Sequence, residues 1–223
     1  MIKEVWYGGR RIAGNAVEIW FWAGLSVLIG YLPFAQWIVQ LLTGQDLKTL
    51  GTGNIGVSAA FHHGGVTAGI LTVILEIARS VGVVLVAHIL TGQGVWESAC
   101  LVALVLGRNL GGGGGVTNTF WGGLIYSPWS ALGVLISGGM LFLLTRNRRW
   151  ARMYIYVSLP FWIYAIERNF SEVILAIVLS LLLGWMDRNL ADDLDLEEGK
   201  NRGSKTIQSF LQGKTSDNRP KSS

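Results

Sequence analysis

The chain has 223 residues, of which 51% are hydrophobic and only 14% are charged, with a formal net charge of +4. Soluble domains carry about 25% charged residues, so this composition excludes an ordinary soluble protein and indicates an integral membrane protein. The ten tryptophans agree with this, because the indole ring favours the membrane–water interface. The single cysteine, Cys100, excludes an internal disulfide and a cysteine-rich metal site.

Seven apolar runs predict an all-α, polytopic fold with about seven transmembrane helices. A helix needs roughly 20 apolar residues to cross the hydrocarbon of a bilayer. The first run is too long for the core of a cleavable signal peptide, which has about 7–15 residues. Four runs are clear, at 17–42, 66–90, 129–145 and 171–187, and three are shorter, at 95–107, 119–127 and 154–166. Counts of five or six remain open, since 95–107 and 119–127 can also form one broken element around a run of glycines.

Basic residues in the short loops predict the orientation, because cytoplasmic loops carry an excess of Lys and Arg. Loop 146–153 holds four arginines and is expected in the cytoplasm. With seven spans, loops 43–65 and 108–118 and the C-terminus fall on the same side. The N-terminal segment, which carries three basic residues, then faces outside against the rule.

The chain divides into two parts by composition. Residues 1–190 are expected to form the membrane domain. Residues 191–223 are polar and nearly free of apolar side chains, which predicts a disordered tail on the cytoplasmic side.

The first informative loop, residues 50–58, reads Leu-Gly-Thr-Gly-Asn-Ile-Gly-Val-Ser. Glycine lets the backbone turn its N–H groups inward, which makes an anion-binding nest. Thr52, Asn54 and Ser58 add side-chain donors, and such a loop at the start of a helix suits phosphate. The alternative is a flexible connector between two helices.

The second informative loop combines Arg108 and Asn109 with five consecutive glycines, 111–115, and is followed by Thr117 and Asn118. Ordering five glycines costs backbone entropy. That cost is tolerable where a ligand must approach the backbone closely, so we favour a ligand-binding loop over a flexible linker.

Two ionisable residues, Glu76 and Arg79, lie three apart inside the 66–90 run and can pair on one helix face. Ionisable groups within a membrane helix are costly and indicate a functional site, with a structural ion pair as the alternative. His62 and His63 lie near the first loop without further ligands, which makes a poor metal site. The sequence therefore predicts neither a metal nor a cofactor, and no nucleic-acid partner.

Taken in order, these motifs resemble the bacterial membrane glycerol-3-phosphate acyltransferases that use acyl-phosphate as donor. The resemblance spans residues 25–198. It rests on Gly-Tyr-Leu-Pro-Phe-Ala at 30–35, Gly-Thr-Gly-Asn-Ile-Gly-Val-Ser-Ala at 51–59, Glu76 with Arg79, the segment 107–117, Tyr-Val-Ser-Leu at 156–159, and Arg-Asn-Leu at 188–190 with Glu198.

The resemblance implies an enzyme of the inner (plasma) membrane that serves phospholipid synthesis. It would move an acyl chain from acyl-phosphate to the 1-hydroxyl of glycerol-3-phosphate, with the motif loops and the C-terminus in the cytoplasm. The expected partners are these two substrates and membrane lipid, while the oligomeric state is left open. The expected catalytic residues are Arg108, Asn54 and Ser58. The expected substrate-binding residues are Thr52, Gly53, Gly56, His62, Glu76, Arg79, Gly112, Gly113, Gly114, Ser158 and Asn189.

Two cationic positions of the family pattern differ in this chain. The Lys of the family's second motif falls on Gly113 or Gly114, and an Arg of its first motif falls on His62. Arg108 or Arg79 can take over the cationic role, because Arg binds phosphate in a bidentate way. The alternative function is therefore a catalytically inactive relative that binds lipid or a partner protein.

Overall fold

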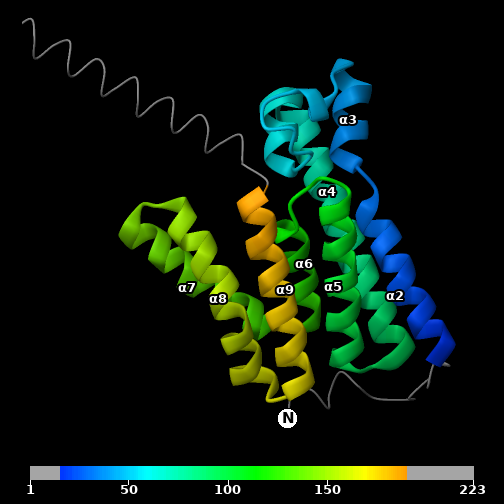
Figure 1. Cartoon of the computed structure of the whole chain (residues 1–223), viewed down its shortest axis with the longest axis vertical. Coiled ribbons are helices and arrows are strands. Elements are labelled where there is room, and N and C mark those ends of the chain that lie inside the picture. Colours follow the sequence, from blue (N-terminus) through cyan, green and yellow to red (C-terminus); the bar gives the residue numbers. More distant parts are fainter. Residues whose placement is uncertain (1–15, 190–223) are drawn as a thin grey trace, which may run out of the picture.

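The computed structural model describes residues 16–189, and every regular element in this part of the chain is helical, as predicted (Figure 1). The elements in order are α2 (Ala16–Tyr31), α3 (Phe34–Thr43), the short 3₁₀ helix η1 (Leu47–Thr49), α4 (Val57–Thr91), α5 (Gly94–Leu110), α6 (Val116–Tyr126), α7 (Pro128–Thr145), α8 (Arg148–Glu167) and α9 (Phe170–Asn189). The predicted tail 191–223 lies outside the described residues.

Four helical stretches are long and apolar enough to cross a membrane, namely Val17–Thr43, Val57–Thr91, Pro128–Thr145 and Phe170–Asp187. They coincide with the four clear apolar runs of the sequence. The three shorter runs correspond to α5, α6 and α8. Helices α5 and α6 pack against each other as separate helices rather than forming one broken element. The count of seven spans stays a prediction.

The first apolar run, expected as one helix over 17–42, is broken between α2 and α3 at Leu32 and Pro33. Proline has no N–H to donate and disfavours the helical conformation in the residue before it. Backbone carbonyls freed at a helix end must find partners inside the protein. Arg79 of α4 supplies them, because its Nη1 donates to the carbonyls of Gly30 at 3.2 Å and Leu32 at 3.0 Å.

The loops are shorter than the sequence indicated. Helix α4 begins at Val57, so the expected loop 43–65 ends nine residues early and His62 lies within a helix. The backbone of α4 kinks at Gly65, whose φ of 79° suits glycine. Ala59 and Ala60, before the kink, and Ala68, just after it, pack α4 against Ala35 and Val39 of α3. Between α7 and α8, only Arg146 and Asn147 remain of the expected loop 146–153.

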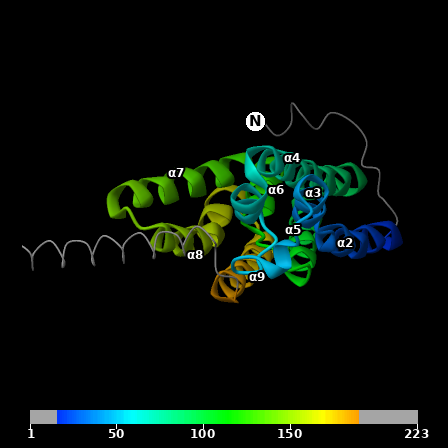
Figure 2. The ribbon, with the colours of Figure 1, turned by 90° about the horizontal axis from the view of Figure 1, so that it is seen from above.

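Helices α2 and α5 lie side by side in close contact (Figures 1 and 2). Glycines at Gly30, Gly107 and Gly111 form this seam, because a Cβ at any of them would overlap backbone atoms of the opposing helix. Small residues at such contacts let helix backbones approach closely in a membrane protein. The seam fixes the end of α5, from which Arg108 projects.

Helices α3 and the first part of α4 lie at one end of the bundle, beside the loop that connects α5 to α6 (Figure 1). Helices α7 and α8 form a pair that extends to one side, and α8 packs on α9 (Figure 2). The two glycine-containing loops therefore meet the end of α9 and the start of α8 at one end of the molecule.

Candidate active site

A cavity of about 410 Å³ lies where these segments meet. Its walls come from the first loop, the end of α5, the glycine run, and the facing ends of α8 and α9. Its polar lining residues are Asn54, Ser58, Glu76, Arg108, Thr117, Arg152, Tyr156 and Asp187. The cavity thus brings together residues that are up to 133 positions apart in the sequence, from Asn54 to Asp187.

Arg108 is the central cation of this cavity and is only 1% exposed. Its Nη2 donates to the Ile55 carbonyl at 2.5 Å, and its Nε lies 3.3 Å from Oε1 of Glu76. Within the described residues, its Nη1 has no hydrogen-bond partner. A buried guanidinium with a donor to spare is a strong site for a phosphate or carboxylate oxygen.

Glu76 and Arg79 form the expected i, i+3 ion pair, with both side chains buried. Glu76 lines the cavity and also faces Arg108, so one carboxylate balances two cations. Arg79 does not line the cavity, because its guanidinium is committed to the carbonyls at the end of α2 and packs 5.1 Å from the Phe34 ring. The structure therefore gives Arg79 a structural position.

The first loop contributes some of its expected residues. Asn54, Gly56 and Ser58 line the cavity. The Oδ1 atom of Asn54 is buried and has no hydrogen-bond partner in the part of the chain that is described. An amide can present its NH₂ group instead after a half-turn, so Asn54 can donate to a phosphate. Thr52 and Gly53 lie outside the lining. They shape the turn, where Gly53 has a φ of 73°.

The glycine run is ordered by the first loop and by Arg108. The Ile55 N–H donates to the Gly112 carbonyl at 3.2 Å, which ties the two loops together. Gly112 has a φ of 83°, a conformation that side chains disfavour. Gly113 packs so closely on the Arg108 guanidinium that an added Cβ would overlap it, whereas a Cβ at Gly114 would meet nothing within 4 Å. Of these three glycines, only Gly114 lines the cavity.

The opposite wall holds an ion pair that the motif analysis did not single out. The Nε of Arg152 in α8 lies 3.0 Å from Oδ1 of Asp187 in α9, and the Tyr156 hydroxyl lies 3.5 Å from the same oxygen. Arg152 and Tyr156 are four residues apart, so they share a helix face. The sequence places Arg152 in the basic loop 146–153 and offers it as one further candidate cation, but it does not predict the pairing with Asp187.

Two further expected site residues, His62 and Ser158, lie elsewhere. His62 is exposed on the first part of α4, where its ring stacks edge-on against His63 with centroids 4.6 Å apart. Ser158 is buried, and its hydroxyl donates to the Ile155 carbonyl at 3.3 Å. Asn189 is the last residue of α9, and its side chain lies outside the described part of the chain. The structure therefore does not bring His62 or Ser158 into the cavity lining.

The charges of the cavity wall are nearly balanced. The lining holds the cations Arg108 and Arg152 and the carboxylates Glu76 and Asp187, and Arg79 adds one further positive charge through Glu76. Because both carboxylates face guanidinium groups, neither is placed to act as an unpaired base. The arrangement suits the binding of anionic groups by donors and cations.

Comparisons with known proteins agree with the resemblance seen in the sequence. The model of the family described as glycerol-3-phosphate acyltransferase matches residues 20–194. A glycerol-3-phosphate acyltransferase of Anaeromyxobacter sp. (strain K) is 33% identical over 129 residues, which cover 53% of this chain and 64% of that relative, less than two thirds of its length. The glycerol-3-phosphate acyltransferase 1 of Dehalococcoides mccartyi is 30% identical over 176 residues. These residues cover 72% of this chain and 85% of that relative.

A solved structure has the same fold. The crystal structure of PlsY, an integral membrane glycerol 3-phosphate acyltransferase, in its glycerol 3-phosphate form superimposes with a TM-score of 0.67. The match covers 88% of this chain and 93% of that one at 23% identity, so it supports the architecture alone. The family match, the two relatives and the apolar helices lead to one conclusion: the chain is an integral membrane protein of the glycerol-3-phosphate acyltransferase family.

Proposed function

We propose that the chain transfers an acyl group from acyl-phosphate to the 1-hydroxyl of glycerol-3-phosphate. The single observation that carries this proposal is the buried guanidinium of Arg108, whose Nη1 lacks a partner among the described residues at the wall of a 410 Å³ cavity. Family membership supplies the reaction class. The relatives bear the name glycerol-3-phosphate acyltransferase.

The two substrates each bring a phosphate, and the cavity offers two cationic walls. Arg108 and the amide of Asn54 would hold one phosphate at the glycine-rich loops. Arg152, held by Asp187, would hold the other from the side of α8 and α9. Cations and fixed donors around transferring groups act most strongly where water is excluded.

The reaction forms one ester bond and releases inorganic phosphate. The 1-hydroxyl oxygen attacks the acyl carbonyl, the bond between that carbonyl and the phosphate oxygen breaks, and the hydroxyl proton leaves with the departing phosphate. This route needs no protein base, which agrees with both carboxylates of the wall being paired with arginines. The residues of the chain act by positioning and by charge stabilisation.

The proposed enzyme lies in the plasma membrane with its glycine-rich loops and C-terminus in the cytoplasm, where glycerol-3-phosphate is available to the cavity. The arginines of segment 146–152 support this orientation. Membrane lipid surrounds the helices and receives the acylated product.

The test is an acyl-transfer assay of the purified protein with palmitoyl-phosphate and glycerol-3-phosphate. We expect acylated glycerol-3-phosphate and an equal amount of inorganic phosphate. Palmitoyl-coenzyme A serves as the control donor and should give less product. Absence of product with either donor would contradict the proposal and would favour the inactive relative.

A further inference from the structure

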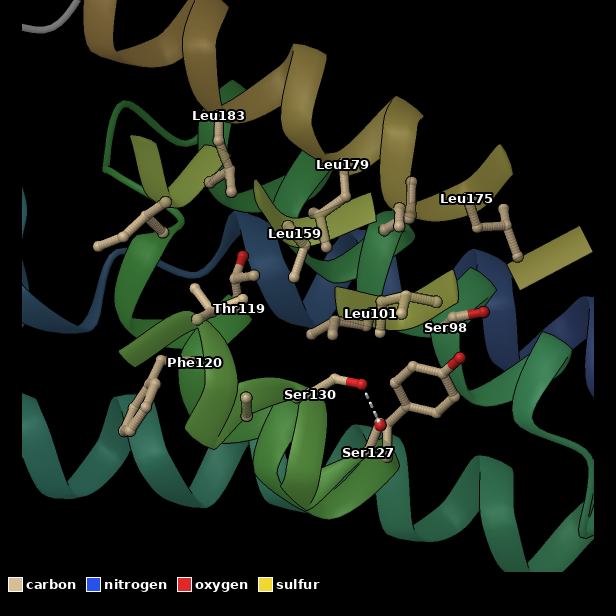
Figure 3. Close-up of a pocket in the computed structure, with 18 of the residues that line it drawn as sticks. Ser98, Leu101, Thr119, Phe120, Ser127, Ser130, Leu159, Leu175, Leu179 and Leu183 are labelled. Atoms are coloured by element: carbon tan, nitrogen blue, oxygen red, sulfur yellow. Dashed lines mark hydrogen bonds between the residues drawn. The ribbon is translucent and has the colours of Figure 1, made fainter. Parts of the chain in front are cut away.

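A second cavity, of about 210 Å³, runs between α5, α6, α7, α8 and α9 (Figure 3). Its walls include aliphatic side chains from three of these helices, namely Leu101, Leu159, Ile163, Leu175 and Leu179. The cavity therefore suits an apolar ligand rather than a polar one.

This apolar cavity adjoins the cavity of the candidate active site, because Val116 and Leu183 line both cavities. Along α9 the lining extends from Leu183 to Glu172, and along α6 from Val116 to Tyr126. At 1.5 Å per helical residue, these stretches are about 16 Å and about 15 Å long. The apolar cavity is thus elongated and parallel to the helices, as the leucines along α9 in Figure 3 indicate.

The far end of the apolar cavity is lined by residues that carry polar groups. We call this end the polar floor and define it as Tyr126, Ser127, Ser130 and Glu172. The Tyr126 hydroxyl donates to Glu172, which also accepts from Nδ2 of Asn169 at 3.0 Å. The Ser127 Oγ lies 2.7 Å from the Ser130 hydroxyl (Figure 3). The groups of the polar floor are therefore hydrogen-bonded within the protein.

We propose that the apolar cavity holds the acyl chain of the donor and that the polar floor sets the upper limit of its length. This inference rests on the acyl-transfer function proposed above. If the methyl end of the acyl chain reaches the polar floor, it has to separate hydrogen-bonded polar groups in apolar surroundings, which is unfavourable. Tyr126 and Glu172 are thus specificity-determining residues that lie far from the reacting atoms.

The dimensions give the limit. A C–C bond of about 1.5 Å with a tetrahedral angle advances an extended chain by about 1.25 Å per carbon. About 16 Å of helix therefore accommodates roughly 13 carbons beyond Leu183. Longer chains must bend or push on the polar floor, and such overpacking lowers affinity by about tenfold or more.

Binding of n-alkyl phosphates with 10 to 20 carbons to the full-length protein in lipid nanodiscs tests this inference. These probes carry a phosphate and one chain but no transferable acyl group, so the result does not depend on turnover. Affinity is expressed per mole fraction of probe in the lipid. Since lipid is as apolar as the cavity, we expect nearly equal affinities for chains that fit and a sharp fall for longer ones.

Gly123→Leu moves the limit in a predictable direction. Gly123 lines the apolar cavity one helical turn above Tyr126, and a Cβ there meets only the Ala131 Cβ, at 3.8 Å. Three residues of helix correspond to about 4.5 Å, so the fall in affinity should occur roughly three or four carbons earlier. Gly139→Leu is the matched control, because Gly139 is exposed on α7, has open space and does not line the cavity. Gly139→Leu should not change the chain length at which affinity falls.

Leu175→Phe, near the polar floor, is the second variant if Gly123→Leu does not fold, and it should also shift the limit toward shorter chains. Affinities that show no fall up to 20 carbons, or a limit that neither variant moves, would overturn the inference. A limit that moves as expected in a protein without acyl transfer would support the apolar cavity and contradict only the proposed function. Acyl transfer without a length limit would support the proposed function and contradict only the inference about the apolar cavity.

Discussion

The Nη2 atom of Arg108 donates a 2.5 Å hydrogen bond to the backbone carbonyl of Ile55, 53 residues earlier in the chain. The N–H of the same Ile55 donates to the Gly112 carbonyl. The cation and the two glycine-containing loops therefore hold one another in place. Arg108 consequently has two roles, in the architecture of the loops and in the binding of an anion.

The double role of Arg108 predicts two separable losses in Arg108→Gln. Acyl transfer should fall by about 10²–10³-fold, because a charged donor is removed from the site. The protein should also lose about 3–5 kcal/mol of stability, because buried Glu76 keeps only Arg79 as its partner. Initial rates and thermal unfolding in the same detergent measure the two effects.

The double variant Glu76→Gln/Arg108→Gln is the control for Arg108→Gln. It removes the buried charge imbalance, so the unfolding temperature should partly recover while the rate stays low. A rate that recovers together with stability would assign Arg108 to structure alone.

The glycine run offers a place for the missing family lysine. At Gly114 a new side chain enters open space at the cavity wall, whereas at Gly113 it collides with the Arg108 guanidinium. Gly114→Lys should preserve or raise acyl transfer, since it adds a cation for the phosphates. Gly113→Lys should lower both the unfolding temperature and the rate. Equal rates and unfolding temperatures for the two variants would contradict the placement of Gly113 against Arg108 and of Gly114 at the open cavity wall.

Asn54 is predicted to contact a substrate phosphate. Asn54→Ala should weaken binding of glycerol-3-phosphate by about ten- to a hundredfold, since a hydrogen bond to a charged group contributes about 1.5–3 kcal/mol. Titration calorimetry of the membrane-inserted protein measures the change. Gln45→Ala, an exposed amide nearby in the chain that does not line the cavity, is the control and should bind as the unmutated protein does.

Arg152 should act as the second cation of the cavity. Arg152→Gln is expected to reduce acyl transfer by at least about tenfold. Arg152→Lys should retain part of it, and Asp187→Asn should have a smaller effect because it changes only the partner that orients the guanidinium. Arg168→Gln removes an exposed arginine at the opposite end of α8 and should not alter the rate. A fully active Arg152→Gln would restrict the anion site to Arg108.

The orientation can be tested with a reporter that is active only outside the cytoplasm. Fused after Leu190, it should stay silent, and inserted after Gln93, between α4 and α5, it should be active. The basis is the clustering of arginines at the α7–α8 junction. The reverse pattern would invert the whole topology.

Much of the fold follows from the sequence because lipid imposes one strong rule. Apolar runs become helices, since every backbone group must be paired inside the element. Three of the four clear runs each lie within one helix, α4, α7 or α9, and the first is divided between α2 and α3. The end of α2 before Pro33 was harder to foresee, because the partner of the Leu32 carbonyl is Arg79, 47 residues further along the chain. Likewise, the residues before Gly65 become helical through packing on α3, which no local pattern encodes.

The site was predictable mainly for motif residues in or directly beside the two glycine-containing loops, and less so for residues further along the helices. Asn54, Ser58 and Arg108 were identified from the loops and line the cavity. Arg79 and Ser158 are buried but turned to other partners, and Asp187 was missed. Which face of a helix meets a cavity is decided by tertiary packing, and a single sequence does not contain that information.

The seam of Gly30, Gly107 and Gly111 has a consequence for the order of events during synthesis. Helix α2 leaves the ribosome first, yet the surface that accepts it is finished only when residue 111 has been made. Until then α2 can contact only lipid or α4. Arg79 of α4 donates to the carbonyls of Gly30 and Leu32 at the end of α2. The wall formed by Leu183, Met186 and Asp187 arrives later still, with the last described helix. A nascent chain therefore acquires the α9 wall of the substrate cavity only late in its insertion. Truncations within α9 should remove this wall together with the core packing of Leu183 and Met186.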